Sequence, residues 1–141
     1  MIKAIIFDCF GVVLDVTTNR KLQPVVDYIA SLKGEFKLAM LSNVSGRASL
    51  ERHFAEGELD ELFDVVVASG DTDYEKPQPE IFQLTALELG VQPDECLFVD
   101  DINRFCEAAD IVGMQTLPFF DAEISLNELK TVVGGFREHT H

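Results

Sequence analysis

The sequence predicts an α/β fold, in which a doubly wound parallel sheet of about five strands carries helices on both faces. Short apolar runs alternate along the chain with longer segments of helical periodicity. The runs are continuously apolar, which is typical of parallel strands that are covered on both faces. The chain shows no internal repeat and no linker. We therefore expect one Rossmann-like domain over residues 1–134 and a loose tail over residues 135–141.

The first half of the chain begins with a buried strand, residues 4–7, that ends at Asp8 and is followed by Gly11. The other elements predicted there are a helix over residues 21–33, a strand over 37–41 that ends at Ser42 and Asn43, a helix over 44–55, an acidic stretch over 56–64 and a strand over 65–68. Gly34 directly follows the first helix, as is common where helices end.

The second half begins with a polar loop, residues 69–79, that holds Lys76. The elements predicted after it are a helix over residues 79–89, a strand over 96–99 that ends at Asp100 and Asp101, a helix over 103–112, a strand over 115–118 and a helix over 124–133. Ser125 is the candidate cap of the last helix.

The formal net charge of −14 bears on the partners of the protein. A chain this acidic is not expected to bind a nucleic-acid backbone or an anionic membrane surface, because both carry negative charge. The same charge repels phosphorylated metabolites, so a phosphate site needs a local source of positive charge. A cation such as Mg²⁺ and a few Lys or Arg side chains would supply it.

The cysteines, Cys9, Cys96 and Cys106, fit neither a zinc pattern nor a set of paired disulfides. We expect reduced core thiols, while the position of Cys9 beside Asp8 leaves a redox-sensitive role open. No apolar run approaches the roughly 20 residues that span a membrane, and the N-terminus lacks the features of a signal peptide. A soluble cytoplasmic protein is therefore expected.

Chemically useful side chains follow the predicted strands. They are Asp8 after the first strand, Ser42 and Asn43 after the second, Lys76 in the loop after the third, and Asp100 and Asp101 after the fourth. Because the carboxyl ends of parallel strands meet at one edge of the sheet, we expect these side chains to lie together. This set of groups suits phosphoryl transfer, because it offers a carboxylate nucleophile, a hydroxyl, a cation and a pair of carboxylates for a metal.

These strands carry four motifs that resemble those of the haloacid dehalogenase-like (HAD) superfamily of hydrolases, and the resemblance covers nearly the whole chain. F-D-C-F-G-V-V at residues 7–13 resembles the first motif, L-S-N at 41–43 the second, E-K-P-Q-P-E-I-F at 75–82 the third and F-V-D-D at 98–101 the fourth. The run E-A-A-D-I-V-G-M at 107–114 resembles the helix that follows the fourth motif in this family.

The resemblance implies a role for each residue of the expected active site. Asp8 is the implied catalytic nucleophile, which becomes an aspartyl phosphate during the reaction. Lys76 is implied to screen the charge of the phosphate, and Ser42 and the backbone of Asn43 are implied to bind it.

The resemblance also implies a Mg²⁺ cofactor, held by Asp8, Asp101 and the backbone carbonyl of Phe10, with Asp100 beside the ion or acting through water. Typical phosphatases of the family carry a second Asp two residues after the nucleophile, which protonates the leaving oxygen and later activates water. Phe10 occupies that position, and its ring can do neither. General acid–base help of this kind is worth about 10²–10⁴-fold in rate. Weak activity, or a restriction to good leaving groups, is therefore expected.

The chain departs from the family pattern at two further places. Most relatives with this motif set insert a cap domain after the first motif, but only residues 15–23 fill that place here, so we expect no cap domain and an open site. Without a cap, the chain resembles family members that act on macromolecules or that borrow a lid from another subunit of a homo-oligomer. Phe105 stands where the family usually has an Asn that supports the metal site.

The sequence leaves several functions open. The leading hypothesis is a Mg²⁺-dependent phosphoric monoester hydrolase that acts on a phosphorylated small molecule or macromolecule. A catalytically inactive metal- or phosphate-binding domain is the alternative, because both the acid and the cap are missing. Carbon–halogen cleavage by Asp8, as in a 2-haloacid dehalogenase, is less favoured, since that chemistry uses no Mg²⁺ and gives Asp100 and Asp101 no role.

Other polar residues near the motifs are expected to be structural. Arg47 and Arg104 follow the second and fourth motifs, where they could reach a phosphate, but surface salt bridges are the preferred interpretation. We expect no catalytic role for His53, nor for His139 and His141 near the end of the chain.

Overall fold

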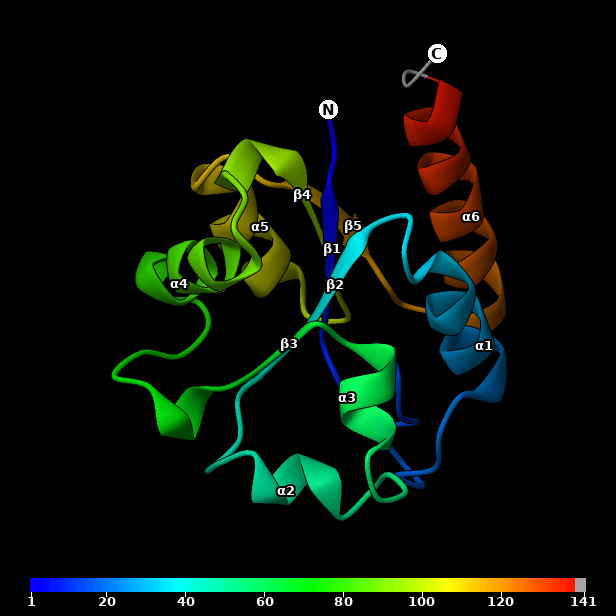
Figure 1. Cartoon of the computed structure of the whole chain (residues 1–141), viewed down its shortest axis with the longest axis vertical. Helices are drawn as coiled ribbons and strands as arrows, with labels where there is room; N and C mark the ends of the chain where they lie inside the picture. The colour runs from blue at the N-terminus through cyan, green and yellow to red at the C-terminus, as the bar shows by residue number, and fades with distance from the viewer. Residues whose placement is uncertain (139–141) are drawn as a thin grey trace.

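The structure, a computed structural model, describes residues 1–138. It confirms the predicted fold class, because one parallel sheet of five strands has the order β3-β2-β1-β4-β5. The strands are β1 (Ala4–Phe7), β2 (Lys37–Ser42), β3 (Val65–Ala68), β4 (Cys96–Asp100) and β5 (Gln115–Pro118). β1 is therefore the central strand, with β2 and β4 on its two sides (Figure 1).

Helices cover both faces of the sheet (Figure 1). Those on one face are α1 (Gln23–Leu32) and α6 (Ala122–Glu138), and those on the other are α4 (Pro79–Leu89) and α5 (Asn103–Ile111). Ile5 and Phe7 of β1 belong to the apolar cluster under α1 and α6, whereas Ala4 and Ile6 belong to the cluster under α4 and α5. Because both faces are covered, β1 is apolar at every position.

The carboxyl end of the sheet is covered by short segments. The connection from β1 to α1, residues 8–22, contains turns and no helix, so no cap domain is inserted there. Two short helices, α2 (Ala48–Glu51) and α3 (Glu58–Leu62), lie near the end of the sheet where β1 and β2 finish (Figure 1). We call residues 44–64 the α2–α3 segment. No helix within residues 1–138 is both long and apolar enough to cross a membrane.

The α2–α3 segment differs from its prediction. The helix expected over residues 44–55 is reduced to α2, because the backbone before it binds the loop after β3 instead. The carbonyl of Val44 accepts a hydrogen bond from the N–H of Gly70 at 2.8 Å, and the N–H of Arg47 donates to Asp71 Oδ2 at 3.0 Å. The acidic stretch at 56–64, where no helix was predicted, contains α3, which buries Leu59 and Leu62.

The last helix, α6, is longer than the expected helix over residues 124–133. It begins earlier because the carboxylate of Asp121 accepts a backbone hydrogen bond from its first turn at 2.8 Å. It ends later because Phe136 packs against Phe36, with the ring centroids 6.5 Å apart. Residues 135–138 of the expected tail are therefore helical. The remaining tail residues, 139–141 with their two histidines, lie outside the described part of the chain.

Candidate active site

The central strands bring two carboxylates together at the carboxyl end of the sheet. Phe7 of β1 pairs with Val99 of β4, so the next residues, Asp8 and Asp100, lie side by side. The N–H of Asp8 continues the ladder by donating to the carbonyl of Val99 at 2.9 Å. Asp8 is 6% exposed and Asp100 is fully buried. Two acidic side chains in such a place need a partner of positive charge.

Lys76 is that partner. Its ammonium group donates to Asp8 Oδ1 at 2.9 Å, to Asp100 Oδ2 at 2.8 Å and to the carbonyl of Leu41 at 3.1 Å. These bonds use all three N–H donors of the side chain. The structure thus places Lys76 beside the predicted nucleophile and shows a second bond, to Asp100, that the sequence did not reveal.

The electrostatics of this cluster follow from one cation facing two carboxylates. Burial raises the pKa of Asp8 to about 8; Lys76 opposes the rise and the nearby Asp100 adds to it. Burial likewise raises the pKa of Asp100 against the opposing effect of Lys76. Burial alone would lower the pKa of Lys76, but the two carboxylates outweigh it and raise that pKa. Lys76 therefore stays charged, and a further cation would favour the ionised form of both carboxylates.

Asp101 completes a group of residues suited to such a cation. Asp8, Asp100 and Asp101 each offer one carboxylate oxygen, and these three oxygens lie within 4.8 Å of one another. Asp101 Oδ1 is buried and has no hydrogen-bond partner among residues 1–138. Gly11 leaves the room that the carboxylate of Asp101 occupies, because a Cβ atom at Gly11 would lie 2.2 Å from Asp101 Oδ2. An oxygen-lined site with an unpartnered oxygen fits a hard divalent cation such as Mg²⁺.

Ser42 and Asn43 lie at the end of β2, next to the central strand. Ser42 is the last residue of β2 and is 2% exposed. The amide of Asn43 makes a pair of bonds to the backbone of Lys76: its Nδ2 donates to the carbonyl, and its Oδ1 accepts from the N–H, both at 2.9 Å. Asn43 therefore positions Lys76, a role that the sequence did not reveal because 33 residues separate the two.

The two aromatic residues that depart from the family pattern have different surroundings. Phe10 is half-buried, and its ring meets the imidazole of His53 edge to face, with the centroids 5.4 Å apart and the planes at 89°. Phe105 is buried, and its ring centroid lies 5.1 Å from Lys76 Nζ and 4.9 Å from Arg104 Cζ. Where the family pattern has an amide, the protein thus has a ring that contacts the ammonium group of Lys76.

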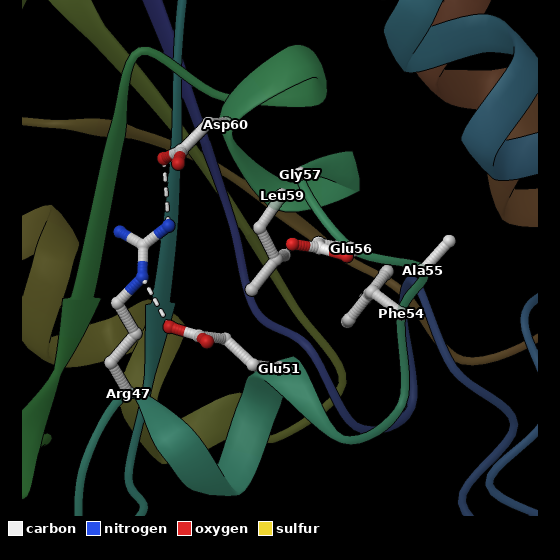
Figure 2. A pocket seen from close by; sticks show the side chains of 8 residues that line it. All are labelled: Arg47, Glu51, Phe54, Ala55, Glu56, Gly57, Leu59 and Asp60. Atoms are coloured by element: carbon white, nitrogen blue, oxygen red, sulfur yellow. Dashed lines mark hydrogen bonds and ion pairs between the residues drawn. The ribbon is translucent and has the colours of Figure 1, made fainter.

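Arg47 lies in a pocket of about 440 Å³ between α2 and α3 (Figure 2). Its guanidinium group lies between two carboxylates in that view. Nε donates to Glu51 Oε1 at 2.9 Å, and Nη2 donates to Asp60 Oδ1 at 2.7 Å. The preferred interpretation of Arg47 as a salt-bridging residue is therefore confirmed.

The cysteines are free and buried, as predicted. Burial, together with the neighbouring Asp8, raises the pKa of Cys9 to about 12 against the opposing charge of Lys76. Burial raises the pKa of Cys96 to about 12 and that of Cys106 to about 11. Since the thiolate is the reactive form, the redox-sensitive role left open for Cys9 finds no support in this environment.

Comparison with known proteins places the chain among hydrolases. A family model described as haloacid dehalogenase-like hydrolase matches residues 19–109, a range that includes Lys76, Asp100 and Asp101 and begins after Asp8. The chain is 34% identical over 94 residues to the fructose-1-phosphate phosphatase YqaB of Escherichia coli, and this match covers 67% of the chain and 50% of the relative. The chain spans half or less of the length of the curated relatives it matches.

Solved structures share the fold. An uncharacterized protein from Corynebacterium glutamicum has a TM-score of 0.79 and 24% identity, with 95% of this chain and 96% of that chain covered. A HAD family enzyme from Bacteroides thetaiotaomicron, in complex with magnesium and inorganic phosphate, has a TM-score of 0.72 and 16% identity, with 84% and 94% covered. At these identities the similarity shows the fold alone.

Proposed function

Because the chain belongs to the haloacid dehalogenase-like hydrolase family, we propose that it is a Mg²⁺-dependent phosphatase with Asp8 as its nucleophile. The observation that carries this proposal is the buried cluster in which Lys76 joins Asp8 to Asp100, with the unpartnered oxygen of Asp101 nearby. The Escherichia coli relative is named a fructose-1-phosphate phosphatase, and the Bacteroides enzyme is described as a complex with magnesium and inorganic phosphate. Both descriptions support the same chemistry here.

The residues that would hold Mg²⁺ are Asp8, Asp101 and the backbone carbonyl of Phe10, with Asp100 as a direct ligand or one that acts through water. The three carboxylates fit this role because their oxygens lie together and one of them lacks a partner. When bound, the ion neutralises negative charge on the phosphoryl group during the reaction. When ionised, these three carboxylates carry more negative charge than the single positive charge of Lys76 balances, which further favours a bound cation.

The protein's own residues carry out the two chemical steps that we propose. A carboxylate oxygen of Asp8 attacks the phosphorus atom, and the bond to the leaving oxygen breaks. Lys76 stabilises the developing negative charge, while the hydroxyl of Ser42 and the backbone N–H of Asn43 bind the phosphoryl oxygens. A water molecule then attacks the phosphorus of the aspartyl phosphate, which releases inorganic phosphate and frees Asp8.

The substrate that we propose is a phosphorylated small molecule, with a phosphorylated segment of a macromolecule as the second option. The absence of a cap domain between β1 and α1 leaves room for either one, or for a lid from a second copy of the chain. The buried free cysteines support a cytoplasmic location.

The test is the hydrolysis of para-nitrophenyl phosphate by the wild type and by Asp8→Asn, with Mg²⁺ and with a chelator. We expect the variant to lose on the order of 10⁴–10⁶-fold in kcat, as other enzymes do when the nucleophile is removed. The exposed Asp94 provides the matched control, and Asp94→Asn should keep the wild-type rate. Equal rates for the wild type and Asp8→Asn would end the proposal.

A phosphate-binding domain without catalysis is the second candidate, and Phe10 is the observation that favours it. Its ring occupies the position of the family's acid and base, and it packs against the apolar core. This candidate predicts that a phosphate mimic such as trifluoroberyllate binds at Asp8 in the presence of Mg²⁺, whereas no phosphate ester is turned over.

A further inference from the structure

Arg104 has a guanidinium group without an acidic partner, although the chain holds 25 Asp and Glu residues against 11 Lys and Arg. Among residues 1–138, the structure records no ion pair or hydrogen bond of this group, so the salt bridge expected from the sequence is not found. Its recorded contact is with the ring of Phe105, whose centroid lies 4.9 Å from Cζ. The group is therefore available to bind an anion, and the inference about that anion rests on the proposed function.

The backbone places Arg104 at the carboxyl end of the sheet. It is the second residue of α5, which begins at Asn103, two residues after Asp101. The N–H of Ile102, the residue before the helix, donates to Asp100 Oδ1 at 3.0 Å and so ties the start of α5 to the buried cluster. Arg104 itself is exposed. It therefore lies on the solvent side of the cluster, where a substrate would enter.

The ring of Phe105 fixes the distance between Arg104 and the proposed nucleophile. Its centroid lies 5.1 Å from Lys76 Nζ and 4.9 Å from Arg104 Cζ, so the two cations are at most about 10 Å apart. Lys76 Nζ in turn lies 2.9 Å from Asp8 Oδ1. Arg104 Cζ is therefore at most about 13 Å from the oxygen of Asp8.

A small molecule can bridge this distance. The phosphorus atom that Asp8 attacks lies about 3 Å from the attacking oxygen. The central atom of a carboxylate or phosphate lies about 4 Å from the Cζ atom of an arginine that binds it. At most about 6 Å then remains between the two anionic centres, which is about their separation when three carbon atoms join them. Such a molecule can contact Asp8 and Arg104 at once.

Other basic side chains at this end of the sheet are already occupied. Lys76 uses all three of its N–H donors within the buried cluster. Arg47 is paired with Glu51 and Asp60. With a net charge of −14, the protein would repel a second negative charge on a substrate unless a nearby cation balanced it. Arg104 supplies such a cation.

We propose that Arg104 is a specificity-determining residue, which binds a second anionic group of the substrate. The substrate is then a small phosphate ester that carries a further carboxylate or phosphate about three carbon atoms away. The planar guanidinium group suits either one, because it offers two parallel N–H donors to a pair of oxygens. The buried ring of Phe105 provides a surface on which the guanidinium group rests.

Non-hydrolysable phosphonates test the binding step without turnover. Butylphosphonate carries one anionic group, whereas 4-phosphonobutyrate adds a carboxylate and propane-1,3-bisphosphonate adds a second phosphonate. In calorimetric titrations at a fixed free Mg²⁺ concentration, we expect the wild type to bind at least one of the doubly anionic ligands about 10-fold more tightly than butylphosphonate. The two ligands distinguish a carboxylate from a phosphate as the second group. Equal affinity for all three ligands would overturn the proposal.

Variants then assign the preference to Arg104. Arg104→Gln should remove it and leave the affinity for butylphosphonate unchanged, whereas Arg104→Lys should keep part of it, since the charge remains but the paired donors are lost. Lys130, exposed on α6 across the sheet from α5, provides the matched control. Lys130→Gln removes the same charge and should keep the preference. An equal loss in Lys130→Gln, or an undiminished preference in Arg104→Gln, would overturn the role of Arg104.

Kinetics on para-nitrophenyl phosphate separate this inference from the proposed function. That substrate has no second anionic group, so Arg104→Gln should keep both kcat and KM on it. If Asp8→Asn abolishes this turnover and the doubly anionic phosphonates bind no better than butylphosphonate, only the role of Arg104 is wrong. If the wild type and Asp8→Asn hydrolyse para-nitrophenyl phosphate equally, the proposed function is wrong and this inference fails with it.

Discussion

The centre of the carboxyl end of the sheet and the α2–α3 segment beside it are held together in different ways. At the centre, Lys76 is 3% exposed and bonds to Asp8 and Asp100, which are 6% and 0% exposed. In the α2–α3 segment, Arg47 and Glu58 form ion pairs that solvent reaches. Charges without access to solvent depend fully on one another, whereas exposed ones are stabilised by water in any case.

Because of this difference, the two regions are expected to tolerate amino-acid substitutions differently. The centre carries the chemical groups of the proposed reaction, and the loss of Lys76 leaves both Asp8 and Asp100 buried without their cation. The ion pairs of the α2–α3 segment are exposed to solvent and contribute little to stability. We therefore expect the loss of Lys76 to affect folding and activity together, and the loss of an ion pair in the segment to have little effect on folding.

The largest effect is expected for Lys76→Met. It leaves two buried carboxylates without their cation, and breaking a buried pair in this way costs about 3–5 kcal/mol. Urea unfolding followed by circular dichroism should show this loss in the free energy of unfolding, and phosphatase activity should disappear. A loss below about 1 kcal/mol would show that the centre does not depend on Lys76 and would break the comparison.

A smaller effect is expected for Gly11→Ala. The φ angle of Gly11 is 94°, and the new Cβ atom would lie 2.2 Å from the carboxylate of Asp101. We expect the free energy of unfolding to fall by about 1–3 kcal/mol. We also expect Mg²⁺ to raise the melting temperature of the wild type but not that of Gly11→Ala.

Gly34→Ala is the matched control for that substitution. Gly34 has a similar φ angle of 88°, but a Cβ atom there meets nothing within 4 Å. It should cost about 1–2 kcal/mol through backbone strain alone and keep the stabilisation by Mg²⁺. If Gly11→Ala and Gly34→Ala respond equally to Mg²⁺ in a thermal shift assay, Asp101 is not a metal ligand.

Lys21→Met tests the α2–α3 segment and should have a minor effect. The side chains of Lys21 and Glu58 are 32% and 20% exposed, so solvent screens their ion pair. We expect a change of about 0–1 kcal/mol in urea unfolding, decreasing as salt is added. A loss as large as that of Lys76→Met would show that the two regions do not differ in the way described.

The smallest effect is expected from thiol reagents. Cys9 lies next to Asp8, is fully buried and has a pKa raised to about 12, chiefly by burial. Iodoacetamide should therefore leave Cys9 unmodified in the native protein, whereas all the cysteines should react in urea. Mass spectrometry of the peptide that contains Cys9 measures both results, and rapid labelling of the native protein would contradict the interpretation of Cys9 as an inert core residue.

The sequence predicts the centre well because each of its residues ends a buried strand or follows one. Asp8 and Asp100 are found where apolar runs stop, and parallel pairing then brings them together. The contacts of Asn43 and Phe105 with Lys76 could not be predicted, because they depend on the folding of distant segments onto one another. The strands that lead to the centre were predictable for the same reason, because apolar runs mark them.

The α2–α3 segment was predicted poorly because tertiary contacts determine its backbone. The carbonyl of Val44 binds Gly70 rather than continuing a helix, although the local sequence favours one. Leu59 and Leu62, three positions apart, are the local signal for α3, but acidic neighbours obscure it. The contact between the rings of His53 and Phe10 also has no sequence signal, because it joins two separate segments of the chain.

The pair of hydrogen bonds between Asn43 and Lys76 has a consequence for how relatives of this protein can diverge. These bonds join Asn43 directly to Lys76 and so close the segment of chain between them. The position of Lys76 therefore does not depend on the length of that segment. Doubling the length of a closed loop costs only about 0.6 kcal/mol in chain entropy. Evolution can therefore lengthen or replace the intervening chain, and with it the neighbourhood of the substrate, without moving the lysine.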